Sequence, residues 1–207
     1  MTVRPEYWLR AKRTLARRDP VLAGIMRERP RIALQSRGDP FQTLARSIVG
    51  QQISVKAAQS VWNRLAGVVP AVAPEAVAEL RLRRLRACGL SGRKSEYLRD
   101  LARHFVDGTI QVQRWPEMDD EAVIAELVQV RGIGRWTAEM LLMFSLLRPN
   151  VLPVDDLGLR RAASRHYFEG EEVGADELRA FGARWEPWRS VAAWYLWRSL
   201  EPVPVEY

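Results

Sequence analysis

Cysteine, lysine and long apolar runs are scarce in this chain of 207 residues. Its single cysteine, Cys88, excludes an internal disulfide and the four cysteine ligands of an iron–sulfur cluster. No stretch approaches the roughly 18 apolar residues that a membrane-spanning helix requires, and His104 and His166 lack the spacing of a metal site. The first residues contain no apolar signal core. We therefore expect a cytoplasmic protein without an iron–sulfur cluster, a catalytic metal or a membrane partner.

Arginine, in contrast, is abundant. The chain holds 32 basic and 25 acidic residues, which gives a formal net charge of +7, and only Lys12, Lys56 and Lys94 are lysines. A basic balance of this size favours a polyanionic partner. Genomic base composition can also enrich arginine, so the charge alone fits a solvated surface as well as a nucleic-acid partner.

Apolar residues recur at helical spacing along almost the whole chain, which predicts an all-α fold with short connections. Asp39, Ser54 and Asp119 stand where helix N-caps are expected. Only residues 109–112 suggest a brief extended piece. The expected helices cover residues 7–18, a short stretch ending at 29, 40–49, 54–65, a short stretch from 74, 91–105, 121–129, 136–147, 156–167, 175–185 and 187–200.

The most informative segment is 130–138, with the sequence VRGIGRWTA, which joins two helical patterns through very few residues. Two helices joined so closely form a helical hairpin. Gly132 and Gly134 allow positive φ and close approach of another backbone. The free N–H groups at the start of the second helix form an anion site, and in a basic protein the expected anion is a DNA phosphate.

Four stretches together resemble a known family: SIVGQQIS at 47–54, GIGRWTA at 132–138, LPVDDLG at 152–158 and RWEPWRS at 184–190. They are similar to the helix-hairpin-helix DNA glycosylases, and within them to the AlkA-type 3-methyladenine DNA glycosylases. The resemblance implies two helical lobes with a DNA-binding cleft between them. It places a central helical barrel at about residues 35–147 and a second lobe at 1–34 plus 148–207. The chain resembles a minimal form that lacks the N-terminal β domain of some relatives.

The resemblance places the family's catalytic aspartate on Asp156, which lies 22 positions after Gly134. A helix of about 14 residues covers roughly 20 Å of that path, and a turn then returns the chain to the start of a new helix. A carboxylate at a helix N-terminus is favoured in its ionised form and can stabilise the positive charge that develops on the sugar during base excision. One aspartate could instead serve only as an N-cap, which suits Asp155, a neighbour that we also expect near the substrate.

Trp136 stands where bifunctional relatives carry a lysine nucleophile, and no lysine follows Lys94. The resemblance therefore implies a monofunctional enzyme that leaves an abasic site without cutting the strand. It also implies that Trp136, Trp197 and Met140 line the base pocket, where an indole would stack on a cationic alkylated purine. Trp136 could alternatively be plain helix core. Met140 replaces a tyrosine of some relatives, which predicts a wider or softer pocket.

A base that leaves the duplex opens a gap that a side chain must fill, and the aligned wedge position is Gln52. Ile53 could serve as the wedge instead. Alternatively, the segment could be only a polar turn between helices, with no wedge. Arg131 and Arg135 could contact phosphates or be solvated charges. The residues expected to contact DNA are Gln51, Gln52, Ile53, Arg131, Gly132, Ile133, Gly134, Arg135 and Thr137. By the same resemblance, the backbone at Gln129, Arg131 and Ile133 could hold a monovalent cation, Na⁺ or K⁺.

Three functions are compatible with these patterns. The first is a monomeric, monofunctional DNA-3-methyladenine glycosylase of base excision repair, acting on double-stranded DNA with alkylated bases. Its substrates would be 3-methyladenine and 7-methylguanine, with etheno and other N-alkyl adducts as further candidates. The second is a glycosylase for oxidised or mismatched bases, against which the missing hairpin lysine and cluster cysteines argue. The third is a non-catalytic DNA-binding hairpin, against which the position of Asp156 and the tryptophan-rich segment argue.

Overall fold

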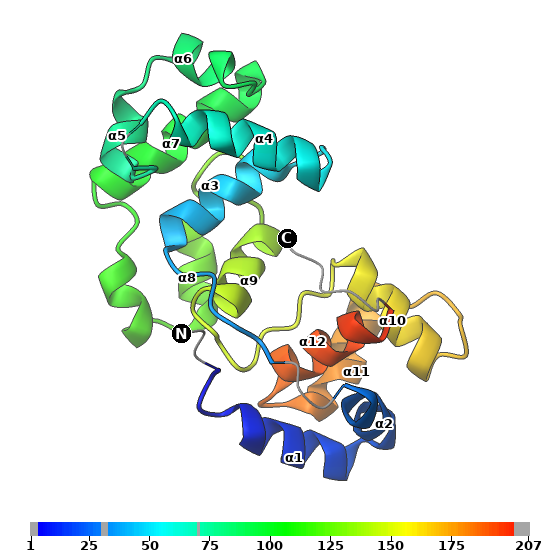
Figure 1. Ribbon diagram of the computed structural model, residues 1–207. Coiled ribbons are helices and arrows are strands. Elements are labelled where there is room, and N and C mark those ends of the chain that lie inside the picture. Colours follow the sequence, from blue (N-terminus) through cyan, green and yellow to red (C-terminus); the bar gives the residue numbers. More distant parts are fainter. Residues whose placement is uncertain (1–3, 30–32, 70, 201–207) are drawn as a thin grey trace. The chain divides into compact units, whose positions relative to one another are not determined.

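The computed structural model describes residues 4–29, 33–69 and 71–200, and every regular element within these ranges is a helix (Figure 1). The predicted all-α fold is confirmed. None of the described helices is long and apolar enough to cross a membrane. The chain divides into two compact units: the hairpin unit, Arg37–Leu141, and the aspartate unit, the described residues of Met1–Ser36 and Leu142–Glu206.

The aspartate unit is built around a helix that is buried on nearly all sides. This helix, α12 (Arg189–Leu200), packs against α1 (Trp8–Arg18), α2 (Pro20–Glu28) and α10 (Leu157–Tyr167). Apolar residues surround its axis, as expected for a helix with no solvent-facing side. Tyr195 on α12 lies against Trp8, with ring centroids 5.8 Å apart, and burial raises the pKa of Tyr195 to about 12.

A buried carboxylate joins the N-terminal helices of this unit to its C-terminal ones. Asp19 is only 5% exposed and caps α2 by accepting a hydrogen bond from the Leu22 N–H (3.0 Å). Its other oxygen, Oδ2, accepts from the hydroxyl of Tyr167 on α10 and from the indole N–H of Trp185, both at 2.9 Å. Because these donors satisfy a buried charge, removing any one of them would leave part of it unpaired.

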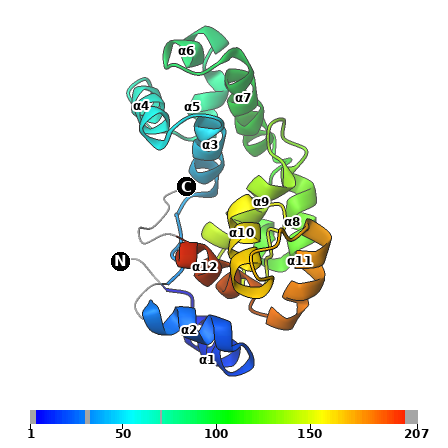
Figure 2. The same cartoon turned by 90° about the vertical axis from the view of Figure 1, so that its right-hand side faces the viewer.

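The hairpin unit surrounds its longest helix, α7 (Gly92–Val106), which packs against α3 (Pro40–Gly50), α5 (Pro74–Glu79) and α6 (Leu82–Ala87) (Figure 2). The expected caps are confirmed, since Asp39, Ser54 and Asp119 each accept a hydrogen bond from an N–H three residues further on. The remaining helices of this unit are α4 (Val55–Ala66), α8 (Asp120–Leu127) and α9 (Arg135–Phe144), within which the boundary at Leu142 falls.

The segment between α5 and α8 differs most from its sequence pattern. The extended piece expected at residues 109–112 is wrong, because the chain bends there and enters the 3₁₀ helix η1 (Val112–Glu117). Asp107 accepts hydrogen bonds from the N–H and the hydroxyl of Thr109 (3.0 and 2.7 Å), which favours the bend. Helix α6 was not expected, because its six residues are too few for a helical period to be recognised and bury only Leu85.

Three helix ends also differ from their patterns. Helix α11 (Ala175–Gly182) continues only as the 3₁₀ turn η2 (Ala183–Trp185), and α12 begins at Arg189 rather than at Pro187. A turn separates them, in which the N–H of Trp188 donates to the carbonyl of Trp185 (2.7 Å). Leu147, which the pattern assigned to the second hairpin helix, lies outside α9 with a φ of 54°.

Candidate functional site

Asp156 is buried at the start of α10, with an exposed fraction of 7%. Its Oδ1 accepts two hydrogen bonds, one from the Leu159 N–H at 2.6 Å and one from the indole N–H of Trp197 at 2.8 Å. The positive end of the helix and both donors favour negative charge at this position. The structure thus holds a buried carboxylate in a fixed orientation.

The capping role that the sequence favoured for Asp155 belongs to Asp156, so that expectation is wrong. Asp155 is exposed, and the helix begins one residue later than the alternative required, at Leu157. A hydrogen bond from the Asp156 N–H to the Pro153 carbonyl (3.0 Å) forms the turn that brings Asp156 to the cap position. The cap and the catalytic candidate are therefore one residue, and the two alternatives do not exclude each other.

Trp197 supports the carboxylate from α12. It is 6% exposed and stacks on Phe144, with ring centroids 6.0 Å apart and planes inclined by 21°. Its indole N–H is committed to Asp156. The structure therefore joins the residue expected to be catalytic to one expected in the base pocket, and the hydrogen bond gives Trp197 an orienting role.

Gly158 keeps the Asp156–Trp197 pair free of steric interference, a role that the sequence patterns did not reveal. A Cβ atom at this position would lie 3.1 Å from Asp156 Oδ1 and 3.5 Å from Trp197 Cδ1. The nearer contact is tighter than a carboxylate oxygen tolerates without moving. A glycine two positions after a candidate catalytic aspartate is a signal that could have been read as close packing.

Ser190, near the start of α12, forms hydrogen bonds to the loop that precedes Asp156. Its hydroxyl donates to the Arg148 carbonyl (2.6 Å) and accepts from the Val151 N–H (2.9 Å). Arg189 adds a hydrogen bond from Nε to the Asn150 carbonyl (3.1 Å). These residues of the RWEPWRS stretch received no role from the sequence, yet they position the loop that carries the carboxylate.

The hairpin between α8 and α9 requires glycine at one position and leaves another open. Gly132 has a φ of +86°, and a Cβ there would lie 2.2 Å from Cδ2 of Tyr97. Gly134 has no neighbouring atom within 4 Å of its Cβ position. Ile133, between them, is buried. Gly132 is thus needed by the fold, whereas Gly134 leaves room for a ligand to approach the backbone.

The arginines that flank this turn have acidic partners. The backbone N–H of Arg131 donates to Asp100 (2.9 Å), and its Nε lies 3.4 Å from the same carboxylate. Arg135 donates to Glu121 (2.9 Å) and to Glu139 (3.1 Å), and its hydrogen bonds lower the pKa of Glu121. These carboxylates would compete with a DNA phosphate for either arginine.

The loop between α3 and α4 separates its three predicted DNA-contact residues by role. Gln51 is half-buried and donates from Nε2 to the carbonyl of Gly132 (2.9 Å), so it holds the hairpin. Gln52 is exposed and has a φ of 58°, and Ile53 is 41% exposed. Both remain candidates for the wedge.

Trp136, Thr137 and Met140 all lie on α9 in the hairpin unit. Trp136 is half-buried, whereas Thr137 and Met140 are each 8% exposed. Trp136 and Met140 are four residues apart, so they share one face of the helix. In the part of the chain that the structure describes, no group of three or more His, Cys, Asp or Glu residues could hold a metal ion.

Known proteins are similar to this chain in both sequence and fold. It is 36% identical over 169 residues to YfjP of Bacillus subtilis. The aligned region covers 78% of this chain and 59% of that protein. The crystal structure of DNA-3-methyladenine glycosidase from Bacillus halodurans matches with a TM-score of 0.85 and 36% identity, covering 91% of this chain and 88% of that chain. The 3-methyladenine DNA glycosylase Mag1 of Schizosaccharomyces pombe, in complex with abasic DNA, matches with a TM-score of 0.78 and 30% identity, covering 92% and 96%.

A family match covers the hairpin and the buried aspartate together. Residues 45–189 match the family described as "HhH-GPD superfamily base excision DNA repair protein". This range includes α9, Asp156 and the start of α12, so it spans both compact units. The chain belongs to the HhH-GPD superfamily of base excision DNA repair proteins.

Proposed function

We propose that this protein is a monofunctional DNA-3-methyladenine glycosylase of base excision repair. It would hydrolyse the N-glycosidic bond of a flipped alkylated base in double-stranded DNA and leave an abasic site. Two solved structures support the reaction class, since one is called a DNA-3-methyladenine glycosidase and the other a 3-methyladenine DNA glycosylase bound to abasic DNA. The observation that carries the proposal is the buried Asp156 carboxylate, held by the Trp197 indole.

Asp156 would act on the sugar rather than on the base. As the glycosidic bond breaks, positive charge develops on the sugar, and a carboxylate that is already oriented stabilises it without reorganisation. An N-alkylated purine carries a positive charge and is a good leaving group, so no strong general acid is required. Water then completes the hydrolysis. Trp197 would act through Asp156, as a positioning residue.

The absence of a suitable amine supports the monofunctional reaction. A bifunctional glycosylase attacks the sugar with a lysine and forms a Schiff base. No lysine follows Lys94 in the sequence, and Lys94 itself donates from Nζ to the carbonyl of Val49 (2.8 Å). Burial lowers the pKa of Lys94, but its ammonium is engaged in holding α7 to the end of α3.

DNA binding is proposed for the hairpin unit. The N–H groups at the start of α9 would bind one phosphate where Gly134 leaves the backbone open, and Thr137 belongs to the same turn of helix. Gln52 or Ile53 would fill the gap left by the flipped base. Trp136 and Met140 would contact the base, and Arg131 and Arg135 would approach phosphates in competition with their acidic partners.

The hairpin backbone could also hold a monovalent cation. Peptide carbonyls at Gln129, Arg131 and Ile133 are neutral oxygen donors, which suit Na⁺ or K⁺. The positive φ of Gly132 turns the chain between two of these donors, and a side chain there would collide with Tyr97. A bound cation would add positive charge beside the proposed phosphate site.

The test is an excision assay on methylated duplex DNA with the wild-type protein and Asp156→Asn. Release of free 3-methyladenine and 7-methylguanine, with intact strands and loss of release in the variant, would support the proposal. Strand cleavage by the purified protein would indicate a bifunctional enzyme. Retained DNA binding without release of any alkylated base would favour another lesion class or a non-catalytic DNA-binding protein.

A further inference from the structure

A concentration of unpaired positive charge lies on α6 and on the turn that leads into α7, within the part of the chain that the structure describes. Between Glu79 and Arg99 the sequence holds seven basic residues, against the two acidic residues Glu79 and Glu96. Five of the basic residues are exposed and make no side-chain hydrogen bond or ion pair with the part of the chain that the structure describes. These five residues, the arginine patch, are Arg81, Arg83, Arg84, Arg86 and Arg93.

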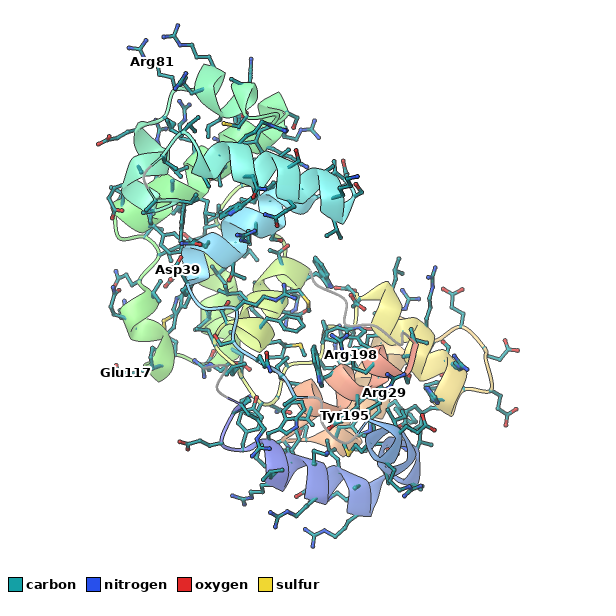
Figure 3. The ribbon with its side chains drawn as sticks, in the orientation of Figure 1. Arg29, Asp39, Arg81, Glu117, Tyr195 and Arg198 are labelled. Carbon is teal, nitrogen blue, oxygen red and sulfur yellow. The ribbon has the colours of Figure 1, made fainter. Side chains whose placement is uncertain are left out.

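The arginine patch differs in this respect from the arginines at the hairpin. Arg131 pairs with Asp100, and Arg135 pairs with Glu121 and Glu139. A guanidinium that already has a carboxylate partner has part of its charge neutralised and some of its N–H donors occupied, which reduces the net gain from binding a phosphate. The patch arginines can bind an external anion at no such cost. Figure 3 shows the side chain of Arg81 extending away from the ribbon beside α6.

The turn that carries the patch is anchored, so its charges have a fixed place in the hairpin unit. Leu85, Cys88 and Leu90 are buried beneath it. Arg64 on α4 donates from Nε to the carbonyl of Cys88 (2.7 Å). An anchored turn presents its arginines at defined spacing, as repeated contacts along a polymer require.

A second anchor ties the patch to the loop with the wedge candidates. Lys94, which follows Arg93, donates from Nζ to the carbonyl of Val49 at the end of α3 (2.8 Å). Val49 stands three positions before Gln52. The helix that begins beside the patch is therefore joined to the end of α3, and the patch and the loop between α3 and α4 belong to the same compact unit.

We propose that the arginine patch binds the phosphate backbone of duplex DNA outside the damaged nucleotide, independently of sequence. The proposal rests on the proposed function, because a duplex must first meet the α3–α4 loop. Guanidinium groups match phosphate oxygens in a bidentate geometry, and each neutralised phosphate releases condensed counterions. The patch would give this protein a salt-dependent affinity for undamaged DNA. The hairpin, whose arginines are paired, would contribute less to that affinity.

The test compares two triple variants that remove the same amount of charge. Arg83→Gln/Arg84→Gln/Arg86→Gln removes the centre of the patch. The control triple substitutes Arg13, Arg17 and Arg27 by glutamine, because these arginines on α1 and α2 are also exposed and unpaired within the described residues. Binding of an undamaged duplex is measured by fluorescence anisotropy at several salt concentrations, after equal melting temperatures have shown that all proteins are folded.

The patch variant is expected to bind roughly tenfold more weakly. Its salt slope should fall by about 1 for each phosphate that the protein no longer neutralises, up to about 3. The control should keep the wild-type slope. Equal slopes for all three proteins would overturn the proposal and leave an acidic protein surface as the candidate partner. An equal reduction in both triples would also overturn it, because net charge alone would then explain the binding.

The outcome is separable from that of the proposed function. Undamaged DNA is not a substrate, so its binding does not depend on excision. If the wild-type protein releases no alkylated base but the patch variant loses salt-dependent binding, the patch is upheld and the glycosylase proposal fails. If excision is found and the salt slopes are equal, the glycosylase proposal is supported and the patch proposal fails.

Discussion

The two compact units of this protein differ in the exposure of their candidate functional groups. The aspartate unit buries its key carboxylate, with Asp156 only 7% exposed and bonded to Leu159 and Trp197. The hairpin unit leaves an open glycine at Gly134 and exposes the arginine patch. Groups that stabilise a transition state work best when they are fixed in advance, whereas groups that hold a long anion must remain accessible. We therefore expect substitutions in the first unit to change excision and those in the second to change binding.

Asp156→Asn should give the largest separation of excision from binding. The amide oxygen can still cap α10, so stability should change little, but the negative charge is removed. We expect the single-turnover rate on methylated duplex to fall by roughly 10²- to 10³-fold, with the dissociation constant for DNA nearly unchanged. A rate within tenfold of wild type would break the comparison, because the buried carboxylate would then not be the chemical group.

Gly132→Ala tests whether the hairpin unit depends on an equally demanding position. The alanine would have to adopt a φ of +86° and would place its Cβ 2.2 Å from the ring of Tyr97. Strain at positive φ and overpacking together should lower the free energy of unfolding by about 3 kcal/mol. Denaturant titration measures this decrease.

Gly134→Ala is the matched control for that variant, because a methyl group there meets no atom within 4 Å. It should leave stability almost unchanged and weaken DNA binding by roughly tenfold, the value of one hydrogen bond to a charged group. If both variants were destabilised equally, the assignment of Gly132 to the fold and Gly134 to the ligand would be wrong.

Trp197→Phe probes the support of the carboxylate. Phenylalanine can retain the stacking on Phe144 but has no N–H to donate to Asp156. Removing a hydrogen bond to a charged group costs about 1.5–3 kcal/mol, so we expect excision to slow by roughly 10- to 100-fold, with unchanged DNA binding. The rate constant under enzyme excess is the measurement.

Trp194→Phe is the control, since the buried indole N–H of Trp194 has no hydrogen-bond partner among the described residues and its ring also contacts Phe144. Excision by this variant should remain within a few-fold of wild type. Equal decreases in the excision rate of the two variants would mean that Trp197 contributes only by packing.

The sequence predicted helices wherever an apolar period was long enough to recognise. Caps with a short polar side chain, such as Asp39 and Asp119, were found because their chemistry is local. Helix α6 was missed because it buries Leu85 alone, and the bend at residues 109–112 depends on hydrogen bonds from Thr109 to Asp107 rather than on a period. Local signals could therefore be predicted, whereas short elements held by tertiary packing could not.

The candidate site shows the same limit. The spacing and the family resemblance identified Asp156, but neither could reveal that Trp197, 41 residues later, donates to it. Likewise, no pattern paired Gln51 with the carbonyl of Gly132, 81 residues away. Residue types were predictable, whereas their partners depend on how helices distant in sequence pack.

Glu121→Gln should have the smallest effect and tests the charge contrast within the hairpin unit. The substitution removes an exposed carboxylate that binds Arg135 and frees this arginine in part for a phosphate, although Glu139 remains as its second partner. An exposed ion pair contributes about 0–1 kcal/mol to stability, so the melting temperature should scarcely change. Affinity for an undamaged duplex should rise by about two- to threefold, with a salt slope that increases by up to about 1.

Glu117→Gln provides the control, because Glu117 is an exposed carboxylate on η1 without a hydrogen bond or ion pair among the described residues. It changes the net charge equally but releases no arginine. If only Glu121→Gln binds the undamaged duplex more tightly, internal ion pairing limits the affinity of the hairpin for DNA. An equal increase in both variants would mean that Arg135 is insensitive to its partner, and the contrast between paired and unpaired arginines would then carry no weight in DNA binding.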